Sequence, residues 1–398
     1  MISDKMVDLV NNSSVIRAMF EEGKRLAGIY GSENVYDFSL GNPNVPAPSQ
    51  VNEAIKDIID NEDSVAVHGY MSNSGYEDVR KTIAESLNRR FGTCFNESNI
   101  IMTVGAAGGM NVFFKAVVNP GDEIIAFAPY FGEYRSYAAN ADGKLVVVEP
   151  DTETFQPDLK RFEELISPRT KAVIVNTPNN PTGVVYSEDT IKKMAEILER
   201  KQKEYGTVIF VFSDEPYREL AYDGVEVPYL TKYYANTAVG YSYSKSLSLP
   251  GERIGYLVIP DELDDSKTIK TACNVATRIL GFVNAPSLMQ KVVGRCVDVD
   301  ISENIAMYDR NRTALYNGLK ELGFECVRPQ GAFYMFVKTP VDDKEFCERA
   351  KKYNILVVPG STFACPGFVR IAYCVSHDTI INSLPKFAEL AEELGLNK

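Results

Sequence analysis

The chain has 398 residues, 45% of them hydrophobic, and carries 42 Lys and Arg against 54 Asp and Glu, a formal net charge of −12 at pH 7. This length allows two or three domains with more than one core. An acidic chain without a basic cluster lacks the phosphate-neutralising patch that nucleic acids and anionic membranes require, so we expect neither as a partner.

The N-terminal segment is predicted to be helical from Ser14 to about Ala27, because apolar residues recur at helical spacing until Gly28. A short strand and a turn follow within Val35–Asn44. From about residue 50 onward, apolar strands alternate with helices, a pattern typical of a parallel sheet covered by helices. We expect its strands at Ile100–Val104, Glu123–Ala128, Lys144–Val148, Ala172–Asn176, Thr207–Phe212, Thr237–Tyr241 and Ile254–Ile259.

Several of these strands are apolar throughout, as strands buried on both faces are. The helices between them include Glu188–Lys203, for which Ser187 is the expected N-cap. A long helix at Ile301–Leu322 closes this region. A smaller α+β unit is predicted after it, with the elements Ala332–Val337, Lys344–Tyr353, Ile355–Val358, Val369–Ala372 and a last helix near residues 379–394.

The predicted fold class is therefore α/β, with two domains. Residues 46–295 form a large domain around a mostly parallel sheet, and residues 1–45 and 296–398 form a small α+β domain with an N-terminal arm. The first residues, MISDKMVDLVNN, do not resemble a secretory signal, and no stretch of about 18 apolar residues predicts a membrane span. With two histidines and scattered cysteines, we expect a cytoplasmic protein without a metal site.

One lysine has a setting unlike that of a solvated charge. Lys245 lies among hydroxyl residues, directly after the strand Thr237–Tyr241 and shortly before Arg253. Desolvation at the end of a buried strand lowers the pKa of an amine, and the neutral amine can form a Schiff base with an aldehyde. The hydroxyls of Ser242 and Ser244 and the Arg253 guanidinium suit the phosphate of pyridoxal phosphate. For the bare motif, a surface lysine among serines is the alternative.

Other candidate residues also follow the carboxyl ends of strands, where open α/β sheets bind ligands. Gly105, Ala106 and Ala107 open a helix whose free N–H groups could hold a phosphate, although close helix packing explains small residues equally well. Asp214 ends an apolar strand, where a carboxylate is costly unless it meets a cation such as a protonated pyridine nitrogen. Tyr217 could donate to the ring oxygen. A helix N-cap is the alternative for Asp214.

The turn Asn176–Gly183 contains two prolines and a glycine, which would hold the Asn180 side chain in one orientation, as an ordinary rigid turn also would. These motifs, in this order from about Leu40 to Tyr373, resemble the class I/II aminotransferases, the aspartate aminotransferase family of fold type I pyridoxal-phosphate enzymes. The resemblance covers nearly the whole chain. It implies the type I fold of these enzymes, pyridoxal 5′-phosphate as cofactor and a homodimer with shared active sites.

The resemblance also implies a role for each matching residue. Lys245 is the Schiff-base lysine, Asp214 is the partner of the pyridine nitrogen, and Asn180 and Tyr217 donate to the ring oxygen. The other expected cofactor-binding residues are Gly105, Ala106, Ala107, Phe131 stacked on the ring, Ser242, Ser244, Arg253 and Tyr70, which reaches the phosphate of the neighbouring subunit. The substrate is expected to meet Gly41, Asn180 and Arg370, whose planar fork suits an α-carboxylate.

The expected activity is transfer of the amino group of an L-amino acid to a 2-oxo acid such as 2-oxoglutarate. An aspartate-like donor is slightly favoured by the resemblance. Ala107, however, stands where many bacterial aspartate enzymes of the family have a lysine that reads the distal carboxylate, and Arg278 is the one substitute we can propose. The alternatives are a carbon–sulfur β-lyase and a broad-specificity alanine or aromatic aminotransferase, which would use the same cofactor residues.

Overall fold

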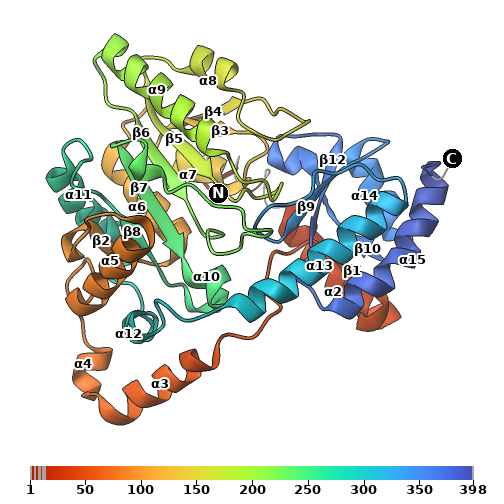
Figure 1. Ribbon diagram of the computed structural model, residues 1–398, viewed down its shortest axis with the longest axis horizontal. Coiled ribbons are helices and arrows are strands. Elements are labelled where there is room, and N and C mark those ends of the chain that lie inside the picture. The colour runs from red at the N-terminus through yellow and green to blue at the C-terminus, as the bar shows by residue number, and fades with distance from the viewer. Residues whose placement is uncertain (1, 4–5, 8–9, 11–14, 397–398) are drawn as a thin grey trace.

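The computed structural model describes residues 2–3, 6–7, 10 and 15–396, and shows two units joined by a long helix (Figure 1). Helix α2 spans Val15–Tyr30. Its predicted first residue, Ser14, lies outside the described residues, and its predicted end at Gly28 is wrong, because the helix continues for another half turn. Leu26 of α2 packs with Val35 and Leu356 in a small buried cluster, which fixes the helix beside the C-terminal unit.

The large unit is built on a sheet of seven strands in the order β2-β8-β7-β6-β5-β3-β4. All neighbouring strands are parallel except β8, which is antiparallel to β2 and β7, so the prediction of a mostly parallel sheet is confirmed. The strands are β2 Ile100–Thr103, β3 Glu123–Phe127, β4 Lys144–Val148, β5 Thr170–Asn176, β6 Phe210–Asp214, β7 Thr237–Ser242 and β8 Gly255–Val258.

The main difference from the sequence prediction is in β6. It begins at Phe210, not at Thr207, and continues to Asp214, because Asp214 is in register with Asn176 of β5 and Gly240 of β7. Pairing with β5 and β7 thus extends the strand past the end of its apolar residues. Asp214 is consequently the last residue of a central strand.

Helices cover both faces of this sheet. Along β6, Phe210 and Phe212 pack into the cluster under one helical layer, and Val211 packs into the cluster under the other, which explains why all three of these residues are apolar. Ser187 caps α9 by accepting from the Thr190 backbone N–H at 3.1 Å, as predicted. The helices are α3 Ser49–Asn61, α4 Ser64–His68, α5 Glu77–Phe91, α6 Gly105–Val117, α7 Glu133–Asn140, α8 Leu159–Leu165, α9 Glu188–Tyr205, α10 Tyr243–Ser246, α11 Ser266–Ile279 and α12 Ser287–Arg295.

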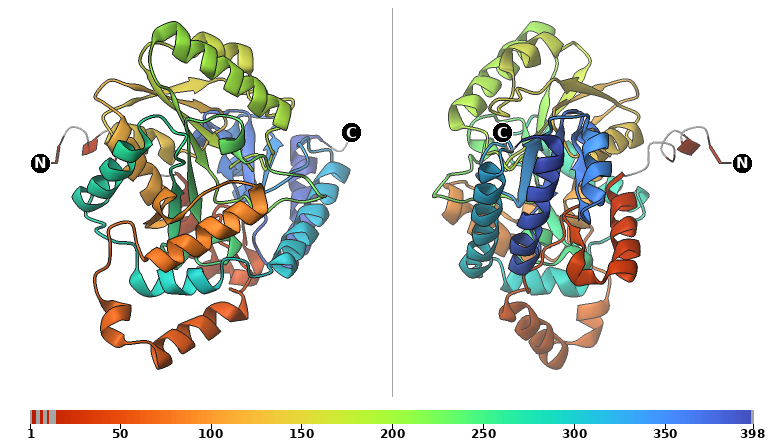
Figure 2. Two further views of the ribbon diagram at one scale, coloured as in Figure 1. Left: turned by 60° about the vertical axis from the view of Figure 1, so that its left-hand side comes forward. Right: turned by 90° about the vertical axis from the view of Figure 1, so that its right-hand side faces the viewer.

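The second unit contains an antiparallel sheet in the order β11-β12-β9 and a parallel pair of β1 with β10. The predicted strand Ile355–Val358 is wrong: its first part pairs with β1 and its last residue belongs to the other sheet, so the chain changes partners between them. Helices α13 and α15 lie side by side on this unit (Figure 2). The elements are β1 Tyr36–Asp37, α13 Ser302–Glu321, β9 Tyr334–Lys338, α14 Asp343–Lys351, β10 Ile355–Leu356, β11 Val358–Pro359, β12 Phe368–Ala372 and α15 His377–Leu394.

The N-terminal segment thus returns to the C-terminal unit. Tyr36 and Phe38 belong to the same buried cluster as Phe333 and Phe387, and the Phe38 carbonyl accepts from the Ala372 N–H at 3.0 Å. This pairing sets the next residues, up to Gly41, at the junction of the two units. The domain boundaries at 45/46 and 295/296 stay predictions. Within the described ranges, no helix has both the length and the hydrophobicity needed to traverse a bilayer.

Candidate active site

A pocket of about 280 Å³ lies where the carboxyl ends of β5, β6 and β7 meet the second unit. Both units contribute side chains to it. Twelve of the residues predicted from the sequence line it, and they are Gly41, Ala106, Ala107, Phe131, Asn180, Asp214, Tyr217, Ser242, Ser244, Lys245, Arg253 and Arg370. The fold therefore brings together residues that are separated by most of the length of the chain.

Lys245 lies on the short helix α10, directly after β7. Ser242 caps this helix by accepting from the Ser244 N–H at 3.2 Å, so the end of the strand and the lysine are held as one piece. The lysine Nζ donates to the Gly41 carbonyl at 2.7 Å and lies 5.2 Å from the centre of the Phe333 ring. Burial lowers the Lys245 pKa to about 8. The neutral, nucleophilic form of the amine is therefore far more populated near neutral pH than in an exposed lysine.

Asp214 presents a buried carboxylate to the same pocket. Burial raises its pKa to about 7, and Glu215 contributes in the same direction, while a hydrogen bond of 2.5 Å from the Tyr134 hydroxyl lowers it. A carboxylate in this position would stay ionised at neutral pH if a cation faced it. The setting therefore suits a protonated ring nitrogen.

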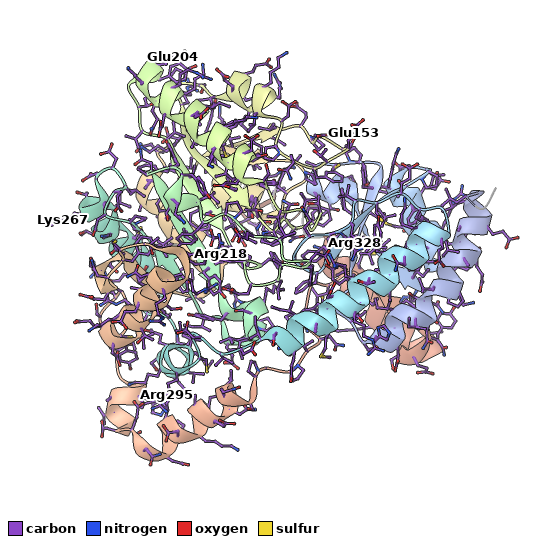
Figure 3. The ribbon with its side chains drawn as sticks, viewed as in Figure 1. Glu153, Glu204, Arg218, Lys267, Arg295 and Arg328 are labelled. Atoms are coloured by element: carbon purple, nitrogen blue, oxygen red, sulfur yellow. The ribbon has the colours of Figure 1, made fainter. Side chains whose placement is uncertain are left out.

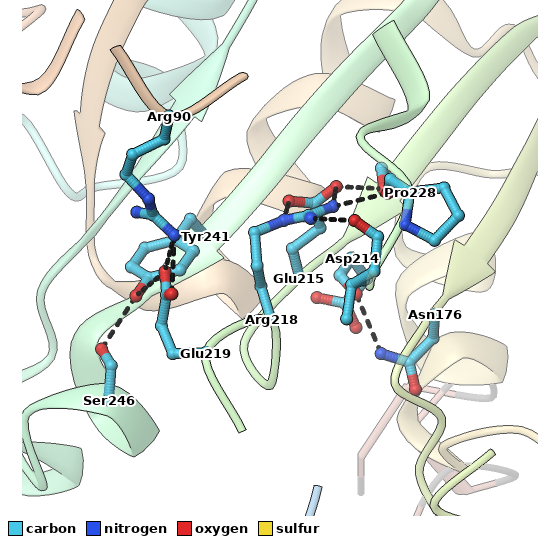
Figure 4. A network of polar contacts seen from close by, with 11 residues as sticks. Arg90, Asn176, Asp214, Glu215, Arg218, Glu219, Pro228, Tyr241 and Ser246 are labelled. Atoms are coloured by element: carbon cyan, nitrogen blue, oxygen red, sulfur yellow. Dashed lines mark hydrogen bonds and ion pairs between the residues drawn. The ribbon is translucent and has the colours of Figure 1, made fainter. Parts of the chain in front are cut away.

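Sequence reasoning missed two of the groups around Asp214. Tyr134 comes from α7, on a different element, and no local pattern pointed to it. Asn176 donates from its side chain to the Asp214 carbonyl at 2.9 Å (Figure 4) and accepts from the Asn180 N–H at 2.8 Å. Its place at the end of the strand next to Asp214 was a signal that could have identified it. Asn176 thereby ties the turn that carries Asn180 to the end of β6.

The start of α6 and Arg253 form a cradle with the chemistry of a phosphate site. Gly105 has φ +70°, and a Cβ there would lie 2.7 Å from an Nη atom of Arg253, so only glycine leaves room for the guanidinium. Ser242 and Ser244 place their hydroxyl oxygens 2.7 Å apart beside it. Guanidinium, hydroxyls and a helix N-terminus are the donors that bind a phosphate, so these residues fit pyridoxal phosphate. Gly105 itself does not line the pocket.

Arg370, on β12, lies on the opposite side of the pocket and is 2% exposed. Its Nη atoms donate to the Ser39 carbonyl at 2.6 Å and to the Asn180 side-chain oxygen at 3.1 Å, while its Nε has no partner. Among the described residues, no carboxylate pairs with it. A buried guanidinium without a counter-ion is costly, and an anionic ligand would supply the missing charge.

Tyr334, on β9, is a further pocket residue that sequence reasoning missed. Its ring lies 4.5 Å from the Arg370 guanidinium, and its hydroxyl shares a hydrogen bond of 2.9 Å with that of Tyr217. A Cβ on Gly41 would approach the Tyr334 hydroxyl to 2.0 Å, which explains why glycine stands there. Tyr334 thus connects the substrate-side residues to Tyr217.

Besides Gly105, two further predicted residues lie outside the pocket of the single chain. Tyr70 follows α4 and is 93% exposed, and Arg278 is exposed near the end of α11. Their predicted roles both require a second subunit. Within a single chain, neither residue lines the pocket with the other site residues.

Comparisons with known proteins agree with this arrangement. The profile of the family aminotransferase class I and II matches residues 33–384. The structure of an amino transferase from Eubacterium rectale is similar to this chain, with a TM-score of 0.95, 49% identity and 99% coverage of both chains. The aspartate/prephenate aminotransferase of Thermus thermophilus is 31% identical over 365 residues, 88% of this chain and 90% of the relative. The structure of Thermus thermophilus aspartate aminotransferase with maleate has a TM-score of 0.87 at 28% identity and covers 98% of this chain and 99% of its own.

Proposed function

Since the chain belongs to the class I and II aminotransferases and is a pyridoxal-phosphate-dependent enzyme, we propose that it transfers the amino group of an L-amino acid to a 2-oxo acid such as 2-oxoglutarate. An aspartate-like donor is slightly favoured. The observation that carries the proposal is the buried Arg370, which has no carboxylate partner among the described residues and shares one pocket with Lys245. Its fork suits the α-carboxylate that amino acids and 2-oxo acids have in common.

Each pocket residue then has a task that follows from its position. Bound pyridoxal phosphate supplies an electron sink for the electrons of the Cα–H bond. Lys245 Nζ holds the cofactor and moves the Cα proton, for which a pKa of about 8 is suited. Asp214 keeps the ring nitrogen protonated, while Asn180 and Tyr217 donate to the ring oxygen. Phe131 stacks on the ring, and the phosphate is bound by Gly105, Ala106, Ala107, Ser242, Ser244 and Arg253.

The identity of the donor depends on how a distal carboxylate is bound. Lys245, Arg253 and Arg370 are the Lys and Arg residues that line the pocket of the described chain, and each already has a task. Ala107 lines the pocket without a charge. An aspartate side chain would therefore need Arg278 from a second subunit. The maleate in the similar structure from Thermus thermophilus, a dicarboxylate, supports an aspartate-like ligand.

The test is to measure kcat/KM for aspartate, alanine, methionine and the aromatic amino acids in the wild type and in Arg278→Ala. We expect kcat/KM for aspartate to fall in the variant by the equivalent of about 2–4 kcal/mol of transition-state binding. We expect kcat/KM for alanine to stay the same, because only aspartate carries the second charge. Arg169→Ala is a matched control, since this exposed arginine precedes the amino end of β5, away from the pocket. Equal losses for all donors, or none, would reject Arg278 and favour the broad-specificity alanine or aromatic alternative.

A carbon–sulfur β-lyase is the second candidate, because elimination needs the same lysine, aspartate and arginine. The two activities differ in what they consume. Transamination requires a 2-oxo acid and releases no ammonia, whereas elimination from a cysteine conjugate releases pyruvate and ammonia without one. Release of pyruvate and ammonia as the main products would replace the proposed function with this one.

We also propose a homodimer, in which Tyr70 reaches the phosphate of the partner. Val65 is 80% exposed, Ile279 is 65% exposed and Tyr70 is 93% exposed, and large apolar side chains left in water are typical of a surface that a second subunit covers. A cytoplasmic location stays a prediction from the sequence.

Complementation tests the shared site. We expect Tyr70→Phe to hold pyridoxal phosphate modestly less tightly, because one donor to the phosphate is lost. Mixed with Lys245→Ala protein, it should form hybrid dimers in which one site has both an intact lysine and the partner's tyrosine. The measurement is cofactor retention after dialysis of the purified hybrid, with light scattering to establish the mass. A monomer, or a hybrid that retains cofactor no better than Tyr70→Phe, would contradict the shared site.

A further inference from the structure

An ion pair lies buried directly behind Asp214. Glu215 is 1% exposed and Arg218 is 5% exposed. Both guanidinium Nε and Nη2 donate to the Glu215 carboxylate, the latter at 2.7 Å, and the Ser213 hydroxyl donates to the same carboxylate at 2.7 Å. Figure 3 labels Arg218 near the middle of the view, and Figure 4 shows the pair beside Asp214. Neither residue lines the active-site pocket.

The environment of Arg218 holds its guanidinium in one place. Its Nη atoms also donate to the Val227 and Pro228 carbonyls, each at 2.9 Å. The guanidinium lies 5.1 Å from the centre of the Phe91 ring and 5.0 Å from that of Tyr229. Away from water, the charges of such a pair are weakly screened and act over several ångströms.

The pair and two site residues lie within residues 214–218, which comprise the end of β6 and the turn that follows it. Along this turn, Asp214 and Tyr217 face the pocket, while Glu215 and Arg218 face the interior behind it. The Glu215 N–H donates to the Gly240 carbonyl of β7 at 2.8 Å, which anchors the start of the turn. The ion pair closes the turn from behind.

We propose that Glu215 and Arg218 are positioning residues that fix this turn and balance the charge behind the Asp214 carboxylate. The proposal deepens the function proposed above and rests on it for its meaning in catalysis. An unbalanced Glu215 anion would favour protonation of its neighbour, whereas an unbalanced Arg218 cation would keep that neighbour ionised. The other titratable groups that face Asp214 are Tyr134 and Tyr137 of α7 and Tyr217.

This role predicts opposite effects for the two single substitutions. Removing the cation with Arg218→Met leaves an anion beside Asp214, so the carboxyl should hold its proton to higher pH. Removing the anion with Glu215→Gln leaves a cation, so it should lose its proton at lower pH. A pair that served only packing would shift Asp214 in the same direction in both variants, or in neither.

The experiment is a pH titration of the cofactor-free protein by infrared spectroscopy, in which the protonated-carboxyl band that is absent in Asp214→Asn reports on Asp214. We expect the midpoint to rise by about one pH unit in Arg218→Met, to fall by about one unit in Glu215→Gln and to return near the wild-type value in the double variant. Pyridoxal phosphate affinity at pH 7, measured by fluorescence titration, should fall several-fold in Arg218→Met and less in Glu215→Gln. Shifts of one sign in both single variants, or no shift, would overturn the proposal.

Arg312→Met is the matched control. Arg312 is also fully buried and pairs with Asp223 at 2.9 Å, but it lies on α13, away from the pocket. Its loss should lower stability without moving the Asp214 midpoint. If Arg218→Met does not fold, Arg218→Lys should keep the wild-type midpoint while Glu215→Gln still lowers it. Because the titration needs neither cofactor nor turnover, it can succeed or fail independently of the proposed aminotransferase reaction.

Discussion

Lys245→Ala is expected to lose catalysis almost completely and to retain no covalently attached cofactor. The loss of proton transfer alone should lower kcat by about 10²–10⁴-fold, and the loss of the covalent attachment adds to it. The measurement is borohydride reduction of the pyridoxal-phosphate-loaded protein followed by mass spectrometry, together with single-turnover kinetics. The wild type should gain the mass of the reduced cofactor on the peptide that contains Lys245, and the variant should not.

The surface lysine Lys203, on α9, provides the control, since Lys203→Ala should behave as the wild type. In the wild type, the rate of covalent loading of the cofactor-free protein should rise with pH and level off above pH 8. The midpoint of this rise should lie near pH 8, because burial lowers the Lys245 pKa to about 8 and only the neutral amine reacts. Turnover by Lys245→Ala at the wild-type rate, or attachment at another lysine, would show that the assignment is wrong.

Asp214→Asn is expected to fold but to lose transamination by several orders of magnitude. Asparagine keeps the shape of the side chain, yet it removes the charge that holds the ring nitrogen protonated. One pKa unit corresponds to about 1.4 kcal/mol, so the loss of several units of stabilisation slows removal of the Cα proton accordingly. The measurement is kcat/KM for the best donor. A loss of only a few-fold would rule out the proposed role of Asp214.

The same substitution should make the cofactor-free protein more stable at pH 8. In the folded state burial raises the Asp214 pKa from 3.8 to about 7, so unfolding releases the carboxylate from an unfavourable environment at high pH. The cost is absent below about pH 4, grows between pH 4 and 7 and reaches about 4 kcal/mol above pH 7. Asparagine lacks this cost. Thermal unfolding of both proteins at pH 5 and pH 8 should therefore give a larger advantage for Asp214→Asn at pH 8.

The sequence by itself determined most of the large sheet and many of the residues that line the pocket. Apolar stretches such as Ile100–Met102 and Ala172–Val175 are fully buried in the sheet, so their composition leaves little ambiguity. Polar residues that directly follow such strands are carried to one edge of a parallel sheet, because the carboxyl ends of its strands lie together. For this reason Asp214 and Lys245 could be predicted as neighbours without a structure.

Only the tertiary structure decided which groups surround these residues. Tyr134 reaches Asp214 from α7, and Arg370 reaches the Asn180 side-chain oxygen across the junction of the two units. The chain changes from one sheet to the other at Val357, because the residues before it pair with β1 and those after it pair with β12. Such contacts depend on how helices and sheets pack at long range, and a hydrogen bond across that distance leaves no periodic pattern in the sequence. The local pattern thus determined where each residue stands on its strand, and packing determined its charge environment.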